Sequence, residues 1–343
     1  MSEEALVYVE RNELRELFKT KLVNAGLPNY LADKTADLMI FADERGIHSH
    51  GSVRTQYYAE RIAKKGLNLD PQFNFEQTGP STGTYFGDNT VGHYVAYEAM
   101  EKAITLAEDS GIGMVGVKEI GHSDAIGYFA EQAAKRGMVA LTVCQSDPMV
   151  VPFGGTEPYF GTNPIAFAAP RENGEPILFD MATTVQAWGK ILDARSKNKS
   201  TPDTWAVDKN GEPTTDPFEV GALLPVAGPK GYGLMMMIDI LSGSLLGLPF
   251  GKHVTSMYED LSEYRRLGQF HIVINPAFFG DKDQFLKQVS EMVEELHAIK
   301  PAKGFDQVYY LGEIQEEVKA QYKESGIPVA QSIYDYLQSD DIY

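Results

Sequence analysis

Four segments of the chain combine cationic, imidazole or short polar side chains within otherwise apolar surroundings. The first spans residues 45–54 and contains His48, Ser49, His50 and Arg54. Tyr58 follows Arg54 by four residues, so the two side chains would share one face of a helix. A guanidinium can pair with both oxygens of a carboxylate, which a phenol or hydroxyl can also orient. The segment therefore predicts a site for a small carboxylate, with a solvated, serine-capped loop as the alternative.

The second segment, residues 119–127, places His122 directly after a predicted strand. The carboxyl end of a strand is a usual position for a catalytic side chain. Histidine is also the commonest general base, because its ordinary pKa is near neutrality. A core histidine with satisfied hydrogen bonds is the alternative. Ser123 or Asp124 is placed to cap the helix that follows.

The third and fourth segments are rich in glycine and in short polar side chains, over residues 146–164 and over 180–184 with 228–233. Glycine permits close approach of the backbone to a flat ligand, and short donors suit phosphates. Structural turns would give the same composition. Lys230 stands among glycines at the expected start of an apolar helix, where a pyrophosphate would be stabilised.

Residues 111–116 match the pattern G-x-G-x-x-G letter for letter. A dinucleotide fingerprint must follow a strand and open a helix. Here a predicted helix precedes the glycines and a strand begins within them, so Gly111 is expected to end that helix. We therefore predict a fold other than the Rossmann fold.

The sequence predicts neither a metal site nor a disulfide. His48 and His50 have no Asp, Glu or Cys at an obvious ligand spacing. Cys144 is the single cysteine and lies in an apolar run, which favours a structural thiol in a reducing compartment.

The formal net charge of −18 argues against nucleic acid or an anionic membrane surface as a partner. The most apolar stretch, residues 234–246, contains Asp239, Ser242, Gly243 and Ser244, and it falls short of the roughly 20 apolar residues of a membrane span. The first residues are acidic where a signal peptide would be basic. We therefore expect a cytoplasmic protein.

The four polar segments are expected to be held in place by a fold of the α+β class. The first eighty residues are predicted to be helical, and apolar spacing indicates further helices at 94–109, 125–136, 284–299, 313–324 and 330–338. Strands are expected at 114–117, 139–144, 164–169, 177–180 and 270–274. We expect residues 1–80 and 277–343 to form a helical substrate-binding and dimerisation part around a sheet domain at 81–276.

Several motifs together resemble the type-2 malate/L-lactate dehydrogenase family of non-Rossmann NAD(P)-dependent oxidoreductases. The matching motifs are Arg-Gly-x-x-Ser-His-Gly at 45–51, Gly-Thr-Asn-Pro at 161–164, Asp-Met-Ala-Thr at 180–183 and Lys-Gly-Tyr-Gly-Leu at 230–234. They occur in family order over most of the chain.

The resemblance implies a seven-stranded, mainly antiparallel cofactor-binding sheet in a homodimer with sites near the subunit interface. It implies a small anionic 2-hydroxy acid as substrate, NAD as cofactor and His122 as catalytic acid/base. The implied cofactor contacts are Ser146, Asp180, Met181, Ala182 and Lys230, with Gly312 and Glu313 as further candidates. The carboxylate-binding candidates remain His48, Ser49, His50, Arg54 and Tyr58, and the sequence leaves open which of the two histidines contacts the substrate.

Two segments depart from the wider family pattern. Ser123 and Asp124 stand where a larger residue and glycine often follow the catalytic histidine, and Trp188 replaces a frequent arginine. These changes indicate a substrate other than malate or lactate. Two alternatives remain: a dehydrogenase for malate, lactate, sulfolactate or a keto-sugar acid, and a hydrolase or lyase that works without NAD.

Overall fold

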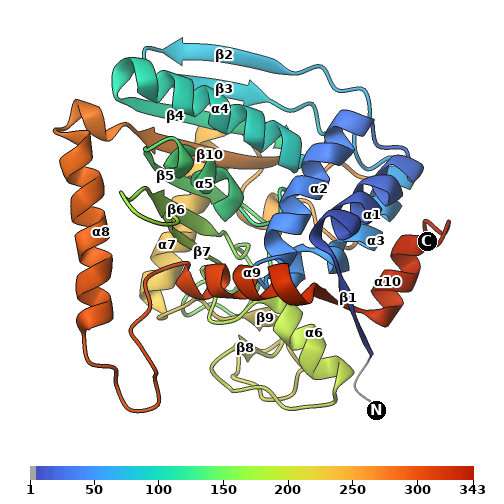
Figure 1. Ribbon diagram of the computed structural model, residues 1–343. Coiled ribbons are helices and arrows are strands. Elements are labelled where there is room, and N and C mark those ends of the chain that lie inside the picture. Colours follow the sequence, from blue (N-terminus) through green and yellow to red (C-terminus); the bar gives the residue numbers. More distant parts are fainter. Residues whose placement is uncertain (1–4) are drawn as a thin grey trace.

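The computed structural model describes residues 5–343 and is organised around a seven-stranded sheet with the order β2-β3-β4-β10-β5-β6-β7 (Figure 1). The strands are β2 (Asn74–Gly79), β3 (Thr82–Phe86), β4 (Ile112–Ile120), β5 (Val139–Cys144), β6 (Ile165–Ala169), β7 (Ile177–Met181) and β10 (Leu267–Ile274). Only β3 and β4 pair in parallel, and every other neighbouring pair in this sheet is antiparallel. The expectation of an α+β fold with a mainly antiparallel sheet is confirmed.

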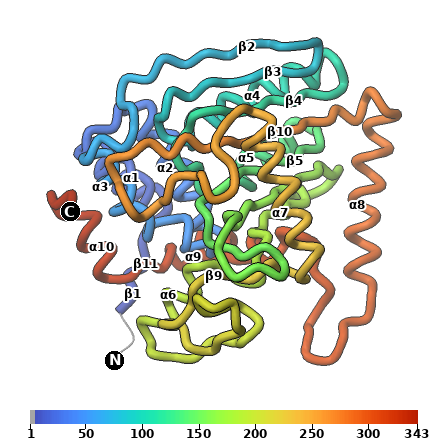
Figure 2. Tube along the Cα trace, turned by 180° about the vertical axis from the view of Figure 1, so that it is seen from behind, coloured from blue at the N-terminus to red at the C-terminus, as the bar shows by residue number. Residues whose placement is uncertain are grey.

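Helices cover both faces of this sheet. On one face lie α4 (Gly92–Ser110) and α5 (Gly127–Lys135), and on the other lies α7 (Pro229–Ser242), which is seen in front in Figure 2. The main core is formed by alanines of α4 and α5 packed on inward-facing strand residues such as Val115, Val117 and Val273. Small side chains let helix and sheet approach closely, so the strand ends are held in fixed positions.

The N-terminal helices pack at one end of the sheet as a separate layer with its own core. They are α1 (Arg11–Asn24), α2 (Asn29–Asp43) and α3 (Thr55–Ala63). Buried Leu14, Phe18, Leu22, Leu31 and Met39 form this core, as their helical spacing predicts. Between α2 and α3 the chain makes two short 3₁₀ turns, His48–His50 and Ser52–Arg54.

The C-terminal segment begins with α8 (Lys282–Ala298), which stands on the side of the molecule opposite these helices (Figure 1). The chain then returns to them through α9 (Glu313–Ser325), β11 (Ile327–Ala330) and α10 (Gln331–Gln338). Strand β11 pairs antiparallel with β1 (Leu6–Val9), and buried Lys21 of α1 donates hydrogen bonds to the carbonyls of Ser339 and Asp341. The two ends of the described chain therefore lie close together (Figure 1).

The expectation that the first eighty residues are entirely helical is wrong at β1 and β2. Both strands escape sequence analysis because they are short or polar: β2 is an edge strand with an almost wholly exposed sequence. Its register is fixed by β3, where the ring of Phe75 covers the space beside Gly83 that a side chain would occupy. The division into a helical part and a sheet domain stays a prediction.

A small lobe beyond β7 contains α6 (Trp188–Ser196) and the two-stranded pair β8 (Ala206–Val207) and β9 (Ala222–Leu223). Three further 3₁₀ segments in the described chain are Ser244–Leu246, Gly251–His253 and Pro276–Phe278. Among the described residues, no helix is long and apolar enough to cross a membrane.

The glycine string at 111–116 has a packing role, as the reversed order of helix and strand predicts. Gly111 ends α4 in the left-handed conformation, with φ +84°, and β4 begins at Ile112. A Cβ at Gly113 would run into the backbone of Ala103 in α4, and one at Gly116 would meet Leu246. These glycines therefore allow helix and strand to come into contact.

Gly113→Ala should destabilise the fold by about 1–3 kcal/mol, because the added methyl group forces α4 away from β4. Chemical denaturation monitored by circular dichroism measures this loss. Gly280→Ala is the matched control, since a Cβ there has no neighbour within 4 Å and no positive φ is required. An equal stability of the two variants would contradict this packing account.

Candidate active site

His122 lies at the carboxyl end of β4, in the loop that leads to α5. Its Nδ1 atom is 2.6 Å from the hydroxyl of Tyr58, which α3 contributes from the N-terminal layer. The His122 side chain keeps 19% of its surface exposed, whereas Tyr58 is buried. The ring is thus held at Nδ1 by the tyrosine, while the accessible part of the ring is available to a ligand.

His50 and Arg54 lie on the same side of the site. The rings of His50 and His122 are stacked, with centroids 6.1 Å apart and an interplanar angle of 20°. Ser49 Oγ is 2.9 Å from His50 Nδ1, and the Ser49 carbonyl accepts a 2.8 Å hydrogen bond from Arg54 Nε. Arg54 Nη1 donates to the Tyr258 hydroxyl at 2.9 Å. The predicted carboxylate-binding segment therefore does come together with His122.

His48 has different neighbours. Its Nδ1 is 2.9 Å from the carboxylate of buried Asp43, and its Nε2 is 3.4 Å from the Tyr322 hydroxyl. The same Asp43 accepts the Ser52 backbone N–H at 2.6 Å, and a Cβ at Gly51 would collide with it. The geometry thus gives the two histidines separate places, with His50 beside His122 and His48 holding the loop to α2.

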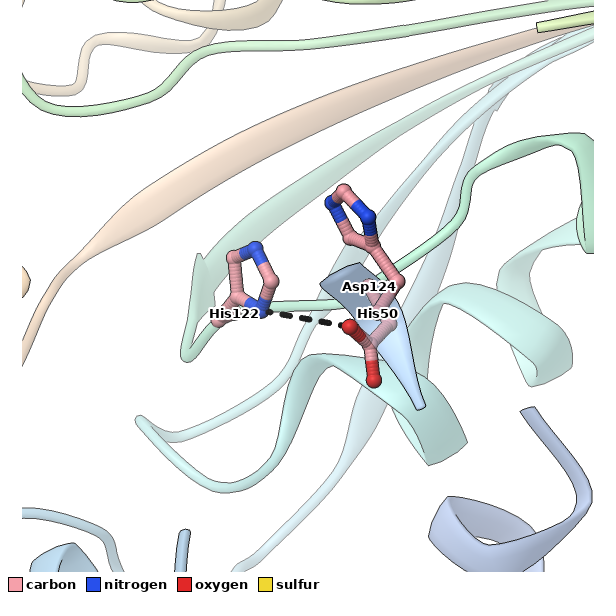
Figure 3. A group of neighbouring side chains, drawn as sticks. All are labelled: His50, His122 and Asp124. Atoms are coloured by element: carbon pink, nitrogen blue, oxygen red, sulfur yellow. Dashed lines mark ion pairs between the residues drawn. The ribbon is translucent and has the colours of Figure 1, made fainter. Parts of the chain in front are cut away.

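Asp124 is a site residue that sequence analysis assigned wrongly. It does not cap α5: its Oδ2 is 3.1 Å from His93 Nε2, and both side chains are fully buried. Its Oδ1 lies 4.0 Å from His122 Nδ1, and Figure 3 shows the carboxylate directed toward that ring. Ser123 does not cap the helix either, since its hydroxyl donates to Gln269 Oε1 at 2.7 Å.

The surroundings of the site shift the acidities of its groups. Burial and then the Arg54 charge hold the pKa of His122 well below its usual value. Burial likewise lowers the pKa of His50, and the Asp124 charge acts against this shift. Burial, followed by the Asp124 charge, raises the pKa of Tyr58 well above its usual value. At neutral pH, His122 is therefore a neutral imidazole that can accept a proton.

A chain of hydrogen bonds gathers three of the segments predicted to bind the cofactor. Ser146 Oγ accepts the Thr162 N–H at 2.8 Å, and the Thr162 carbonyl accepts the Thr183 N–H at 2.9 Å. The Thr183 carbonyl in turn accepts the Val226 N–H at 2.9 Å, just before α7. Buried Asn163 adds a bond from its amide to the Met235 carbonyl of α7 at 3.0 Å.

Asp180 and Lys230 complete this region. The Asp180 carboxylate, rather than Ser123 or Asp124, accepts the Gly127 N–H at the start of α5, at 2.7 Å. Asp180 is exposed at the strand end, and desolvation of its carboxyl group by the surrounding protein raises its pKa to about 6. Lys230 is exposed on the first turn of α7, a helix whose N-terminus has no side-chain cap.

The remaining cofactor candidates lie along β7. Met181 ends that strand opposite Ile165, and Ala182 follows it. Gly312, with φ +94°, is packed so closely on Leu178 of β7 that a side chain would clash. Glu313 is already engaged, because its carboxylate accepts the Tyr310 N–H at 3.0 Å and lies 2.8 Å from His297.

Two groups of side chains have the composition of a metal site, in the part of the chain that the structure describes. In one, ligand atoms of His50, His122 and Asp124 lie within 4.8 Å of one another. There, however, the Tyr58 hydroxyl occupies His122 Nδ1, and a guanidinium lies nearby. The other consists of Glu131, Glu175 and Glu316, of which the first and last are paired with Arg45. These contacts favour a role in proton transfer over metal binding for His50, His122 and Asp124. For Glu131 and Glu316 they favour ion pairing with Arg45.

Burial raises the pKa of the Cys144 thiol to about 12, so this group is protonated at neutral pH. A protonated, half-buried thiol is a poor nucleophile, which agrees with the structural role predicted from the sequence.

The whole chain is similar to known proteins. A family model described as malate/L-lactate dehydrogenase matches residues 9–338. This chain belongs to that family. A protein from Escherichia coli strain K12 named ureidoglycolate dehydrogenase (NAD(+)) is 57% identical over 335 residues, covering 98% of this chain and 96% of that protein.

More distant members of the family have other names. A malate dehydrogenase of Pyrococcus horikoshii is 36% identical, with 98% of this chain and 95% of that protein covered. The solved structure of sulfolactate dehydrogenase from Methanocaldococcus jannaschii superposes with a TM-score of 0.90 at 35% identity, over 97% of this chain and 96% of that one. The family relationship therefore extends over the whole fold.

Sequence analysis missed Asp43, His93 and Tyr258 as neighbours of the site. No local signal marks them, because Asp43 and His93 lie within apolar helices and Tyr258 in an irregular loop. The one pattern in the sequence that could have identified Asp43 and His93 is a charged or imidazole side chain on the apolar face of a helix, where such groups are rarely buried.

Proposed function

We propose that this protein oxidises (S)-ureidoglycolate to oxalurate, with NAD⁺ as hydride acceptor. The choice of substrate rests on the 57% identity, over 98% of the chain, to the E. coli protein named ureidoglycolate dehydrogenase (NAD(+)). The arrangement of His122, Tyr58 and Arg54 supports the chemistry, since oxidation of a 2-hydroxy acid needs a proton acceptor beside a carboxylate site. The departures at Ser123, Asp124 and Trp188 also favour a substrate other than malate or lactate.

Several features of the described structure fit a nicotinamide dinucleotide. Lys230 offers an ammonium group at an uncapped helix N-terminus, which suits a pyrophosphate. Gly233, one turn later, leaves open space where a side chain would stand. Ser146 follows β5, and Asp180, Met181 and Ala182 lie at the end of β7. We propose these four residues as further cofactor contacts, with Gly312 and Glu313 as additional candidates.

In the proposed reaction, the C–H bond of the carbinol carbon breaks while its C–O single bond becomes a carbonyl. Bound NAD⁺ supplies the acceptor for the hydrogen and its electron pair. His122 accepts the hydroxyl proton at Nε2, while its Nδ1–H donates to the Tyr58 oxygen. Arg54 pairs with the substrate carboxylate, helped by His50 and Ser49, so that the C–H bond faces the nicotinamide. His48 contributes indirectly, because its contact with Asp43 holds the loop that carries Ser49, His50 and Arg54 against α2.

A spectrophotometric assay of NADH at 340 nm tests this function with a panel of ureidoglycolate, malate, lactate and sulfolactate. Ureidoglycolate should give the highest kcat/KM. Better use of malate or sulfolactate would assign the protein to that branch of the family. Release of urea without NADH formation would identify a hydrolase or lyase instead.

We further propose that the enzyme works in the cytoplasm, in the release of nitrogen from allantoin and other purine-derived compounds. The single, half-buried free thiol suits a reducing compartment, and the ureido group of the proposed substrate is a nitrogen carrier.

His122→Ala should lower kcat by about 10²–10⁴, the usual contribution of a general base. NADH affinity should be unchanged, because the proposed dinucleotide contacts lie on other segments. Stopped-flow turnover and fluorescence titration with NADH measure the two quantities. His253→Ala, at an exposed histidine, is the control and should retain full activity. Unchanged turnover of His122→Ala at saturating substrate would remove His122 from the mechanism.

Lys230→Met should raise the Kd for NADH by about 10- to 100-fold, because a charge-assisted hydrogen bond to a phosphate is lost. Once NAD⁺ is saturating, kcat should hardly change. Lys252→Met, an exposed lysine toward the other end of α7, should bind NADH normally. Equal affinities in the two variants would show that the pyrophosphate lies elsewhere.

Arg54→Lys should raise KM and lower kcat together, because an ammonium cannot hold a carboxylate in two-pronged geometry. Arg54→Met should cost more, since the bound carboxylate would then lack a charged partner. Initial-rate kinetics with ureidoglycolate measure both effects. Arg136→Lys, at a surface ion pair with Glu101, is the control. Wild-type kcat/KM in both Arg54 variants would exclude Arg54 as the carboxylate ligand.

We also propose that the protein is a homodimer, with the outer face of α7 as its interface in place of the part at residues 1–80 and 277–343 that the sequence analysis expected. That face exposes Met236, Met237 and Ile240, and it continues into exposed Leu245 and Phe250. A contiguous apolar patch of this kind marks an interface in a protein of otherwise charged surface.

Ile240→Glu should therefore convert a dimer into a monomer, measured by light scattering after size-exclusion chromatography. Leu6→Glu on β1, also an exposed apolar position, should leave the dimer intact. A monomeric unmodified protein, or a dimer unaffected by Ile240→Glu, would contradict this interface.

A further inference from the structure

We propose that Asp124 is a positioning residue for the proton transfer, one that stabilises the protonated form of His122. This inference rests on the proposed function for the identity of the reaction, but its physical basis lies in the contacts of the carboxylate. Asp124 is 5% exposed, and one of its two oxygens, Oδ1, has no direct hydrogen-bond partner among the described residues. The Tyr58 hydroxyl, which contacts His122 Nδ1, also interacts with the Asp124 carboxylate, and this interaction helps to raise the Tyr58 pKa.

The unpaired oxygen is directed at the reacting histidine. Oδ1 lies 4.0 Å from His122 Nδ1, and the pair is drawn in Figure 3. An opposite charge at this distance favours the charged form of an imidazole. When His122 accepts the substrate proton, positive charge therefore appears beside a carboxylate that is already in place.

His93 fixes the carboxylate in that orientation. Its Nε2 is 3.1 Å from Asp124 Oδ2, and its other ring nitrogen, Nδ1, has no hydrogen-bond partner in the described part of the chain. His93 is fully buried on α4, where a polar ring is costly unless it serves a contact. Its single hydrogen bond is the one to Asp124.

The backbone at Asp124 supports the same conclusion. Its φ is +62°, in the left-handed region that non-glycine residues rarely occupy. Strained backbone of this kind is found at functional sites, where surrounding contacts hold it. Here the hydrogen bond to His93 is such a contact.

Asp124 is opposed by several cationic or ionisable groups around His122. Arg54 and His50 face His122 from the 48–54 loop, His93 from α4 and Arg265 from the loop before β10, and each lowers its pKa. Tyr58, on α3, supplies a neutral hydroxyl. A base surrounded in this way accepts a proton poorly, so a single well-placed carboxylate has a large effect on its reactivity.

Asp124→Asn and Asp124→Gly test the proposal. Asparagine keeps the shape and an acceptor for His93, whereas glycine removes the side chain and relieves the left-handed backbone. In both variants, the acid limb of the pH profile of kcat/KM should move to lower pH by about one to three pH units, because His122 loses its anionic neighbour. The plateau kcat should fall by about three- to thirtyfold, because a weaker base accepts the proton less readily.

Glu119→Gln is the matched control. It removes one negative charge from the same loop region, where Glu119 pairs with Arg266 on the outside of the site. It should leave the acid limb unchanged. Thermal melts of all variants identify any loss of folding, and Asp124→Gly provides a second measurement if Asp124→Asn folds poorly.

A substrate-free measurement separates this proposal from the proposed function. NMR titration of the His122 ring, assigned with His122→Ala, should show a lower midpoint in the Asp124 variants than in the unmodified protein. Absence of ureidoglycolate oxidation by the unmodified protein would overturn the function and leave this test intact. An acid limb and a His122 midpoint that do not move in either variant would overturn the role of Asp124, including the case in which kcat alone falls.

Discussion

The 2.6 Å contact between the Tyr58 hydroxyl and His122 Nδ1 joins two parts of the molecule that fold around separate cores. Tyr58 belongs to α3 in the N-terminal layer, and His122 to the loop after β4 in the sheet. The contact fixes the imidazole ring and brings the loop with His50 and Arg54 against the end of the sheet. The site is therefore complete only when the helical layer is packed on the sheet, and variants that loosen this packing affect chemistry as well as stability.

The charge distribution of the site is opposite to that of the protein as a whole. The chain has a formal net charge of −18, yet Arg54, Arg265 and several histidines surround the reacting position. Such local focusing lets an acidic protein bind a small anion. The same cations depress the pKa of His122, so binding of the proposed anionic substrate and the basicity of the proposed general base are in conflict. A buried carboxylate is one way to reconcile them.

The proposed cofactor region shows how a dinucleotide site can be assembled without a Rossmann unit. Backbone hydrogen bonds connect the 146 and 162 segments to Thr183 and then to the chain before α7. The uncapped N-terminus of α7 carries the same partial positive charge as the phosphate-binding helix of a Rossmann fold. Here that helix packs on the face of a mainly antiparallel sheet opposite α4 and α5. The glycine pattern at 111–116 serves helix packing instead.

Sequence by itself was enough to predict the strongly periodic helices and strands and to reject the Rossmann pattern at 111–116. It was also enough to single out His122, Arg54, Tyr58 and Lys230 as candidate site residues. Both results follow because amphipathic spacing and local turn chemistry are short-range signals. It failed for β1, β2 and β11, which form only by pairing with distant or edge segments. The different neighbours of His48 and His50 were likewise decided by tertiary structure, through Asp43 and Tyr322. So was Asp124, which resembled a helix cap until α4 placed His93 against it. These outcomes depend on contacts between segments far apart in the chain, and a buried carboxylate takes its role from the groups that surround it.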